Sequence, residues 1–497
     1  MTEPTSILAA LLSHATTDPE RPCLTWEGRT LSYGALLALA QAWAGHYQAL
    51  GVQHGDRVGL FLPSGPAFLG AYLGAQLAGA ATVLINTQYR QVELQHILAD
   101  SEPRLVVCDQ AGAEHLQQLA SPILSLKPGA TLPADLQPAL APFELPQAHE
   151  LAILAYTSGT TGRAKGAMLT HGCLAANSAA ICTAWHWSSS DRLLLVLPLF
   201  HIHGLGVGLH GTLWAGASLD LRPRFEPSDV LTTLASGTVT LFFGVPTLYS
   251  RLIAEVRHHA PVHPLPLRLC VSGSAPLAPQ TLTAFEQLFG QRILERYGMT
   301  ETGMNLTNPY LGERRAGTVG MPFPGQEARI VDLQTRAPLP DGLIGELQVR
   351  GPHICAGYWR NLAATAELFH ADGWFSTGDL GWRSADGYYT LTGRARELII
   401  SGGYNIYPRE VEELLLEHPA VAECAVFGLP DPDFGEQVVA AIVPTDPLHP
   451  PVRTELEQFC RERLAAYKRP RTIHFLTALP RNAMGKVQKH QLRDLLA

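Results

Sequence analysis

The sequence LAILAYTSGTTGRAKG, residues 151–166, joins an apolar run to a loop rich in hydroxyl groups and glycine. Its first five residues predict a buried strand, because they are apolar and lead directly into turn-forming residues. In the loop, glycine and short hydroxyl side chains let backbone N–H groups curve around an anion, and Lys165 adds a compact positive charge. The loop is not a Walker A motif, because neither GxxxxGKS nor GxxxxGKT occurs. A strand leading into an anion-binding loop is therefore predicted, with a plain surface loop as the alternative.

Short runs of Val, Leu and Ile recur along the chain, each set off by a helical pattern and a Gly or Pro break. Alternation of this kind is typical of parallel or mixed sheets that are flanked by helices. We therefore predict an α/β protein whose large N-terminal domain contains mixed, largely parallel, helix-flanked sheets. Further runs that predict strands are residues 105–108, 192–197, 241–245 and 268–272.

The C-terminal third of the chain has a different rhythm. Closely spaced glycine turns and alternating segments predict a small β-rich subdomain over residues 317–391. Beyond it, a strand and the Gly402–Gly403 turn lead to a helix expected to begin near Pro408, since proline suits the first helical turn. We predict a large N-terminal domain and a small, mobile α+β C-terminal domain. Their predicted bounds are residues 1–395 and residues 396–497.

Composition and charge exclude several classes of protein. Hydrophobic residues make up 46% of the 497 residues and charged residues 16%, which is the balance of a compact soluble enzyme. The net charge of -8 argues against nucleic-acid binding, because phosphate backbones select basic surfaces. The eight cysteines include no CxxC pair, so neither a zinc site nor a disulfide framework is indicated. A reducing cytoplasm is the expected location.

One apolar stretch, residues 68–85, is long enough to suggest a membrane span. It is interrupted by three glycines and by Gln76. We predict a buried helix, a helix stop at Gly79 and a buried strand, and no membrane span. The first residues also lack the basic and apolar regions of a signal peptide, which agrees with a cytoplasmic protein.

Residues 156–166 resemble the phosphate loop of the adenylate-forming superfamily, which includes acyl-CoA synthetases, luciferases and carrier-protein adenylation domains. The other motifs of that superfamily follow in the same order and span nearly the whole chain. The resemblance implies an ATP-dependent acid:CoA ligase. A carboxylate and ATP would give an acyl-AMP and pyrophosphate, and the acyl-AMP and CoA would then give acyl-CoA and AMP. The matching segments are RLCVSGSAPL (268–277), YGMTET (297–302), WFSTGDL (374–380), GR (393–394) and LPRNAMGK (479–486).

The resemblance also implies roles for single residues. Thr300 would contact the α-phosphate and Glu301 would hold magnesium. Asp379 would take the ribose hydroxyls, Arg394 would offer a second contact to ribose or phosphate, and Lys486 would bridge carboxylate and phosphate. The residues implied to contact ATP are Thr157, Ser158, Gly159, Thr160, Thr161, Gly162, Lys165, Gly273, Ser274, Ala275, Pro276, Tyr297, Gly298, Thr300, Asp379 and Arg394.

Two of the implied contacts are lysines in a chain that strongly favours arginine. Only five of the 36 basic residues are lysine, and Lys165 and Lys486 both lie in phosphate-linked motifs. A compact ammonium suits a site that neutralises charge developing on phosphate, so we expect both to be catalytic together with Thr300 and Glu301. The alternative is that two of five lysines fell there by chance.

The second half-reaction needs a thiol, and the resemblance implies how the thiol is admitted. In this superfamily the C-terminal domain rotates after adenylation, which withdraws the Lys486 loop and presents another loop to a pantetheine tunnel. Arg396 occupies the hinge position, where relatives more often carry Asp or Lys. A solvated surface charge is the alternative for this residue. The loop presented to coenzyme A would contain Ser401, Gly402, Gly403 and Tyr404.

Arg296 departs from the pattern of the superfamily, and this departure bears on which acid the enzyme activates. Many acyl-CoA synthetases have a small residue, often Gly, two positions before the glycine of the YGxTE motif, which leaves room for a long acyl chain. A guanidinium there would fill an apolar tunnel and leave an unpaired charge, at a cost of ~3 to 5 kcal/mol. A short diacid would supply the missing counter-charge through a bidentate pair. The alternative is that Arg296 turns outward to pair with Glu295 or another acid.

Three segments, 198–204, 295–310 and 402–408, resemble malonyl-CoA synthetases in particular, which makes malonate the preferred acid. The HxH pair within the first segment is not expected to bind a metal, because the sequence places no third ligand. Another short or medium acid such as methylmalonate, oxalate or a fatty acid stays open, as does a carrier protein as the acceptor. The further candidates for the acid pocket are His201, His203, Ser272 and Met304.

Overall fold

The chain folds as two compact units. No helix within the described ranges is long and apolar enough to cross a membrane. The first unit comprises Met1–Ala328 and Val349–Phe375, and the second comprises Arg329–Gln348 and Ser376–Ala497. The computed structural model describes residues 4–117, 119, 122–127, 129–132, 143–157, 164–256, 264–402, 404–481 and 487–496.

One sheet of the first unit has six strands in the order β6-β5-β3-β4-β7-β8. All neighbouring strands are parallel except β7 and β8, the antiparallel pair that flanks residues 158–163. The central strands are buried and almost wholly apolar, as expected for strands covered on both faces. The strands are β3 (Arg57–Phe61), β4 (Ala81–Leu84), β5 (Leu105–Asp109), β6 (Ile123–Leu126), β7 (Leu151–Thr157) and β8 (Lys165–Thr170).

The other sheet of the first unit has nine strands in the order β15-β14-β13-β12-β11-β9-β10-β1-β2. Six of them, from β13 to β1, run parallel, and β2, β14 and β15 add antiparallel edges. Ligands of open α/β sheets bind beyond the carboxyl ends of such parallel strands. The strands are β1 (Pro22–Trp26), β2 (Arg29–Ser32), β9 (Arg192–Leu195), β10 (Ser218–Leu221), β11 (Leu241–Gly244), β12 (Leu269–Ser272), β13 (Leu294–Met299), β14 (Gly303–Thr307) and β15 (Met321–Pro322).

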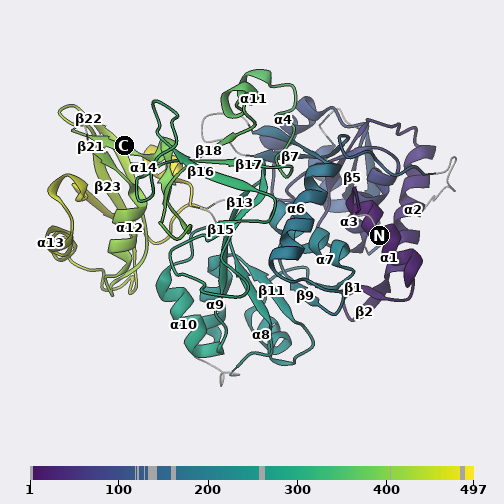
Figure 1. Ribbon diagram of the computed structural model, residues 1–497, viewed down its shortest axis with the longest axis horizontal. Coiled ribbons are helices and arrows are strands. Elements are labelled where there is room, and N and C mark those ends of the chain that lie inside the picture. The colour runs from purple at the N-terminus through teal and green to yellow at the C-terminus, as the bar shows by residue number, and fades with distance from the viewer. Residues whose placement is uncertain are drawn as a thin grey trace. The chain divides into compact units, whose positions relative to one another are not determined.

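Helices pack against both sheets of the first unit (Figure 1). Helix α6 contacts β8 of one sheet and β14 of the other, so it links the two. Local sequence sets several helix starts: the Thr170 hydroxyl accepts from the Cys173 N–H at 3.1 Å, and α3, α8 and α10 begin with proline. The helices are α1 (Ile7–Thr17), α2 (Tyr33–Ala49), α3 (Pro66–Leu77), α4 (Gln91–Ser101), α5 (Gln110–Leu116), α6 (His171–Ala184), a π-helix (His203–Leu209), α7 (His210–Ala215), α8 (Pro227–Ala235), α9 (Pro246–Val256), α10 (Pro279–Phe289) and α11 (Leu362–Leu368).

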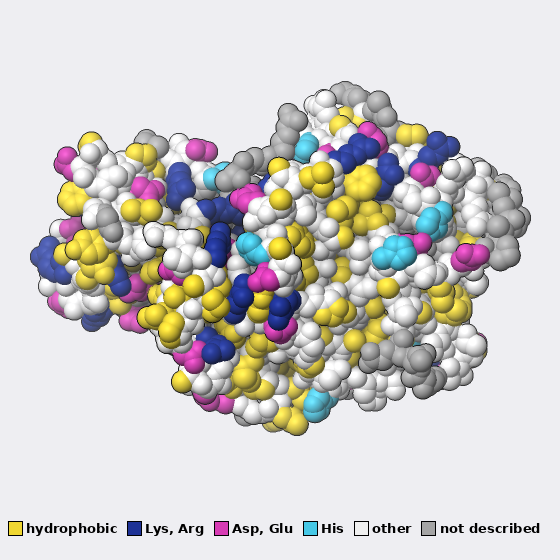
Figure 2. Space-filling view, turned by 45° about the horizontal axis from the view of Figure 1, so that its top comes forward, with side chains coloured by type: hydrophobic (Ala, Val, Ile, Leu, Met, Phe, Trp, Pro, Cys, Tyr) yellow, Lys and Arg dark blue, Asp and Glu magenta, His cyan; other side chains and the backbone are white. Residues whose placement is uncertain are grey.

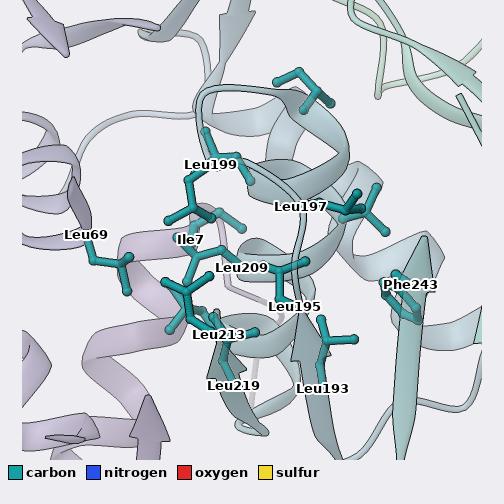
Figure 3. Packing of buried hydrophobic residues seen from close by; sticks show 14 of the residues in the cluster. Ile7, Leu69, Leu193, Leu195, Leu197, Leu199, Leu209, Leu213, Leu219 and Phe243 are labelled. Carbon is teal, nitrogen blue, oxygen red and sulfur yellow. The ribbon is translucent and has the colours of Figure 1, made fainter. Parts of the chain in front are cut away.

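The core of the first unit is largely aliphatic. Figure 3 shows leucines of β9, β10 and the π-helix segment gathered with Ile7 of α1 and Leu69 of α3. Burying each such side chain contributes about 1.5–3 kcal/mol. Glycine lets the π-helix segment approach this core closely, because a Cβ on Gly208 would lie 2.9 Å from the Leu195 side chain.

The second unit contains two smaller sheets. One has the order β16-β17-β18-β19, and the other has the order β21-β20-β23-β22 with β24 added in parallel to β23. The elements are β16 (Glu327–Val331), β17 (Gly345–Arg350), β18 (Phe375–Arg383), β19 (Tyr389–Arg394), a 3-10 turn (Ala395–Glu397), β20 (Ile399–Ser401), β21 (Tyr404–Ile406), α12 (Pro408–Leu416), β22 (Val421–Asp431), β23 (Gly435–Pro444), α13 (Arg453–Arg463), a second 3-10 turn (Ala466–Lys468), β24 (Thr472–Phe475) and α14 (Lys489–Leu496).

The predicted α/β architecture is confirmed in its main features. The apolar stretch at residues 68–85 forms most of α3, a glycine stop with φ of 77° at Gly79, and β4. Helix α12 begins at Pro408, as expected. On the face drawn in Figure 2, basic side chains lie among acidic ones. The predicted domain boundary after residue 395 falls within the second unit and stays a prediction.

Candidate active site

Strands β7 and β8 fix the two ends of the predicted phosphate loop. Thr157 and Lys165 are partners across the antiparallel pair. Helix α4 braces both ends, since His96 Nε2 donates to the Ala164 carbonyl at 2.7 Å and the Tyr156 hydroxyl donates to an Asp100 carboxylate oxygen on the same helix at 2.5 Å. The predicted contacts that lie outside the described residues are Ser158, Gly159, Thr160, Thr161 and Gly162.

Glu301 lies in the short turn between β13 and β14 and is only 6% exposed. Glycine makes this turn possible: a Cβ on Gly298 would lie 2.3 Å from the Gly303 carbonyl oxygen, and Gly303 has φ of 59°. The hydroxyls of Thr157 and Tyr358 donate to Glu301 Oε1 at 3.1 and 2.9 Å. The structure therefore brings the end of β7 and the predicted magnesium ligand together.

The surroundings of Glu301 fit a ligand of magnesium. Within the part of the chain that the structure describes, Oε1 accepts both hydrogen bonds and Oε2 accepts none. Magnesium in nucleotide enzymes is usually held by one or two carboxylates together with phosphate oxygens and water. The Lys165 ammonium lies 5.4 Å from the centre of the Tyr358 ring, so a cation and the carboxylate share one tyrosine. Thr300 directly precedes Glu301 in the turn.

The segment predicted to contact adenine follows β12 directly. It contains Gly273, Ser274, Ala275 and Pro276. Ser274 has φ of 68°, a left-handed conformation that is uncommon for a residue with a side chain and is enriched at functional sites. Tyr297 lies on β13, the strand next to β12, and is half-buried.

Arg296 points into the protein and is only 2% exposed. Its guanidinium packs on Gly273, where a Cβ would lie 2.5 Å from Arg296 Cζ. Its Nε and Nη2 have no hydrogen-bond partner among the described residues. Burial lowers the pKa of Arg296 to about 9, and among the described residues Tyr249 acts electrostatically in the opposite direction. One carboxylate oxygen of the neighbouring Glu295 accepts from the Leu277 N–H at 3.0 Å.

Other predicted pocket residues lie close to this guanidinium. The His203 Nδ1 and Ser274 Oγ atoms are hydrogen-bonded at 3.1 Å, and His203 Nε2 and Ser272 Oγ are buried without a partner in the described ranges. Burial, together with the Arg296 charge, lowers the pKa of His201 to about 4 and lowers that of His203 well below its usual value, so both rings are neutral near pH 7. Several unpaired polar groups therefore occur in one small region.

Met304 and its neighbours close the region on the side of β14. Its buried side chain lies against Gly298, where a Cβ would be 2.7 Å from Met304 Cε. Asn177 of α6 holds its backbone: Nδ2 donates to the Met304 carbonyl at 3.0 Å, and the Met304 N–H donates to Oδ1 at 3.2 Å. A cavity of about 10 Å³, room for about one water molecule, lies beside Thr300 and Gly303.

In the second unit, Asp379 and Arg394 are partners across β18 and β19, and Arg394 Nε lies 3.0 Å from Asp379 Oδ1. Arg396 is exposed in the 3-10 turn that follows. Ser401 is buried and Gly402 has φ of 58°. Tyr404 is 58% exposed and stacks on Tyr467 at 4.5 Å between ring centres. Two predicted residues, Gly403 and Lys486, lie outside the described residues.

Sequence reasoning missed two residues that support the predicted ones. Tyr358 reaches Glu301 across 57 positions, and Asn177 reaches Met304 across 127 positions. Neither residue belongs to one of the recognised motifs. Contacts that span so much sequence depend on the tertiary fold, so nothing in the local pattern around either residue identified it.

Comparison with known proteins agrees with this geometry. The family model described as AMP-binding enzyme matches residues 11–359, and the AMP-binding enzyme C-terminal domain matches residues 410–486. A sulfoacetate–CoA ligase of Cupriavidus necator is 38% identical over 98% of this chain and 97% of that protein. A malonate–CoA ligase of Arabidopsis thaliana is 33% identical over 99% and 88%.

Solved structures are similar over the same length. The crystal structure of ATP-bound MatB from Rhodopseudomonas palustris is 38% identical, covers 99% of each chain and has a TM-score of 0.93. Family models, relatives and fold all agree, and the chain therefore belongs to the AMP-binding enzymes and is an AMP-forming acid:CoA ligase.

Proposed function

We propose that this ligase activates a short acid that carries a second anionic group, malonate above all, and transfers the acyl group to CoA. The observation that carries the proposal is the buried Arg296 guanidinium, whose Nε and Nη2 lack partners among the described residues. An uncompensated buried charge costs ~3 to 5 kcal/mol. The second carboxylate of a diacid accepts from both nitrogens at once and removes that cost.

The surroundings of Arg296 support a small and polar acyl group. Ser272 Oγ and His203 Nε2 offer further hydrogen bonds, and the neutral histidine rings add no competing charge. Apolar long-chain acids would also leave the guanidinium unpaired.

Sulfoacetate is the second candidate. It carries a sulfonate in place of the second carboxylate, and the ligase of Cupriavidus necator named for this acid is 38% identical to the chain. A sulfonate has three oxygens, which suits a region with unpaired groups on Arg296, Ser272 and His203. Methylmalonate and oxalate also carry the second charge, whereas a fatty acid does not. A carrier protein is the alternative acceptor of the acyl group.

In the first half-reaction, the carboxylate attacks the α-phosphorus and pyrophosphate leaves. Arg296 holds the remote anion, which leaves the other carboxylate free to react. Thr300 contacts the α-phosphate, and Lys165 and Lys486 neutralise the charge that develops there. Glu301 would hold the magnesium that accompanies ATP, and the metal would supply positive charge that offsets the phosphate charge. No side-chain nucleophile is needed, so catalysis consists of positioning and electrostatics.

In the second half-reaction, the thiol of CoA attacks the acyl-AMP and AMP leaves. We assign the hinge to Arg396, which is exposed in the turn between β19 and β20. Asp379 receives the ribose hydroxyls and is held in place by Arg394 at 3.0 Å. The segment at Ser401, Gly402, Gly403 and Tyr404 meets the pantetheine arm.

A panel of acids, assayed for AMP formation with and without CoA, tests the proposal. Malonate, sulfoacetate, methylmalonate, oxalate, butyrate and a long-chain acid make up the panel. We expect the acids with a second charge to exceed butyrate in kcat/KM, with malonate first, and AMP release to require CoA. Equal turnover of butyrate and malonate would remove the role of a second anionic group. Product formation only with a carrier protein would assign the other acceptor.

A further inference from the structure

Tyr358 contacts two charged groups that the proposed mechanism uses. Its hydroxyl donates to Glu301 Oε1 at 2.9 Å, and its ring centre lies 5.4 Å from the Lys165 ammonium. A hydroxyl that donates to a carboxylate forms a charge-assisted hydrogen bond, and an ammonium near an aromatic face is attracted by its quadrupole. The buried Tyr358 side chain therefore contacts both the Glu301 carboxylate and the Lys165 ammonium.

The backbone on either side of Tyr358 is fastened to the same two elements. Residues 355–359 run beside β8, where the Met168 N–H donates to the Gly357 carbonyl at 2.9 Å. The Cys355 N–H donates to the main-chain carbonyl of Glu301 at 2.8 Å. This segment therefore joins one end of the phosphate loop to the β13–β14 turn. The tyrosine side chain is held from both sides before any ligand arrives.

Glu301 depends on this arrangement for its orientation. Thr157 and Tyr358 both donate to Oε1, which fixes the plane of the carboxylate and leaves Oε2 for a metal. With only one donor the carboxylate pivots about that hydrogen bond, and Oε2 no longer has a single position. Magnesium requires near-ideal octahedral geometry, so it is sensitive to such a loss.

We propose that Tyr358 is a positioning residue for magnesium–ATP, whose hydroxyl orients Glu301 toward the metal and whose ring orients Lys165 toward the phosphates. This inference rests on the proposed role of Glu301 as the magnesium ligand. In this role Tyr358 acts through Glu301 and Lys165. The two functions reside in different parts of one side chain, so substitution can separate them.

Two variants separate the functions. Tyr358→Phe removes the hydroxyl and keeps the ring, whereas Tyr358→Leu removes both. Tyr33→Phe is the matched control, because Tyr33 is a buried tyrosine whose hydroxyl lies within hydrogen-bond distance of two carbonyl oxygens, that of Thr212 in α7 at 3.1 Å and that of Ala217 just after α7 at 2.8 Å. Glu301→Gln tests the premise. Calorimetric titration with α,β-methylene ATP, in Mg²⁺ and in EDTA, measures how much magnesium strengthens nucleotide binding without any turnover.

We expect Tyr358→Phe to reduce the strengthening by magnesium about tenfold, the order of one hydrogen bond to a charged group, and to leave binding in EDTA unchanged. Tyr358→Leu should in addition weaken binding in EDTA by about 2- to 30-fold, because the ring that orients Lys165 is lost. Tyr33→Phe should behave as the wild type in both titrations. In steady-state assays, Tyr358→Phe should raise the magnesium concentration needed for half-maximal rate and spare the KM for the acid.

Equal magnesium dependence in Tyr358→Phe, Tyr33→Phe and the wild type would overturn the inference while leaving Glu301 in its role. Full magnesium dependence in Glu301→Gln would instead overturn the premise, independently of which acid the enzyme prefers. If Tyr358→Leu does not fold, Tyr358→Phe alone decides the role of the hydroxyl.

Discussion

Replacing Arg296 by leucine tests the acid assignment most directly. The substitution keeps a buried side chain of moderate size against Gly273 and removes the guanidinium that lies there. A hydrogen bond to a charged partner contributes ~1.5 to 3 kcal/mol, so losing it from the bound acid lowers kcat/KM for malonate roughly 10- to 150-fold. Butyrate makes no such contact. Its kcat/KM should stay the same or rise, because the variant pocket is apolar.

The assay is AMP release with saturating ATP and CoA, over a range of malonate and of butyrate. Arg296→Lys provides a graded comparison, because it keeps the charge and loses the planar fork. It should fall between the wild type and Arg296→Leu for malonate. Arg292→Leu is the matched control: Arg292 lies four positions earlier and pairs with Glu286 at 2.5 Å instead of facing the pocket. It should leave the ratio of malonate to butyrate unchanged.

Replacing Arg296 by leucine should also change the stability of the enzyme, in the opposite direction to its effect on malonate activity. Arg296 is buried without a described hydrogen-bond partner, so its loss should raise the midpoint of thermal unfolding of the ligand-free enzyme. Saturating malonate should narrow this difference, because the acid stabilises only the wild type. Malonate kcat/KM within about threefold of the wild type in Arg296→Leu would refute the reasoning, since the assigned contact is worth at least about tenfold.

Two further predictions concern the other half of the chemistry and the stability. Lys486→Ala should lose adenylation and keep thioester formation from supplied acyl-AMP; equal loss of both, measured as separate half-reactions, would contradict its assignment. Burial lowers the pKa of His171 and His201 to about 4 and of His210 and His353 to about 3. In the unfolded chain the same rings have a pKa of about 6.5, so as the pH falls they bind protons there first. The free energy of unfolding is therefore highest above about pH 6.5. Below that pH it falls by up to about 1.4 kcal/mol per histidine and pH unit. A melting temperature that stays flat from pH 8 to 5 would count against this.

The sequence allowed the architecture to be predicted wherever one short segment carries the information. The strand at Leu151–Thr157, the glycine stop at Gly79 and the start of α12 at Pro408 each follow from local composition. The direction in which the Arg296 side chain points does not follow from local composition. The sequence left two orientations open for this side chain: inward to a diacid, or outward to Glu295 or another acid. In the structure the guanidinium packs closely on Gly273, so the side chain points inward.

The residues that hold Glu301 in position could not all be predicted from the sequence either. The hydroxyl of Thr157 belongs to a recognised motif, but that of Tyr358 comes from a segment that joins β8 only in the folded chain. Motifs therefore indicated which groups the chemistry needs. The groups that hold them in position depend on tertiary contacts, which no local pattern encodes.

The π-helix at His203–Leu209 has a consequence for how acid preference can change among relatives. A π turn contains about one residue more than an α turn, so a return to α geometry would absorb the deletion of one residue, keep the flanking residues in register and re-orient only the residues inside the segment. His203, at the first position of this segment, is hydrogen-bonded to Ser274, so that contact would change with the geometry of the segment. A pocket of this kind can be remodelled by a one-codon deletion that leaves every lining residue identical, and a residue-by-residue comparison of pocket lists would not register the event.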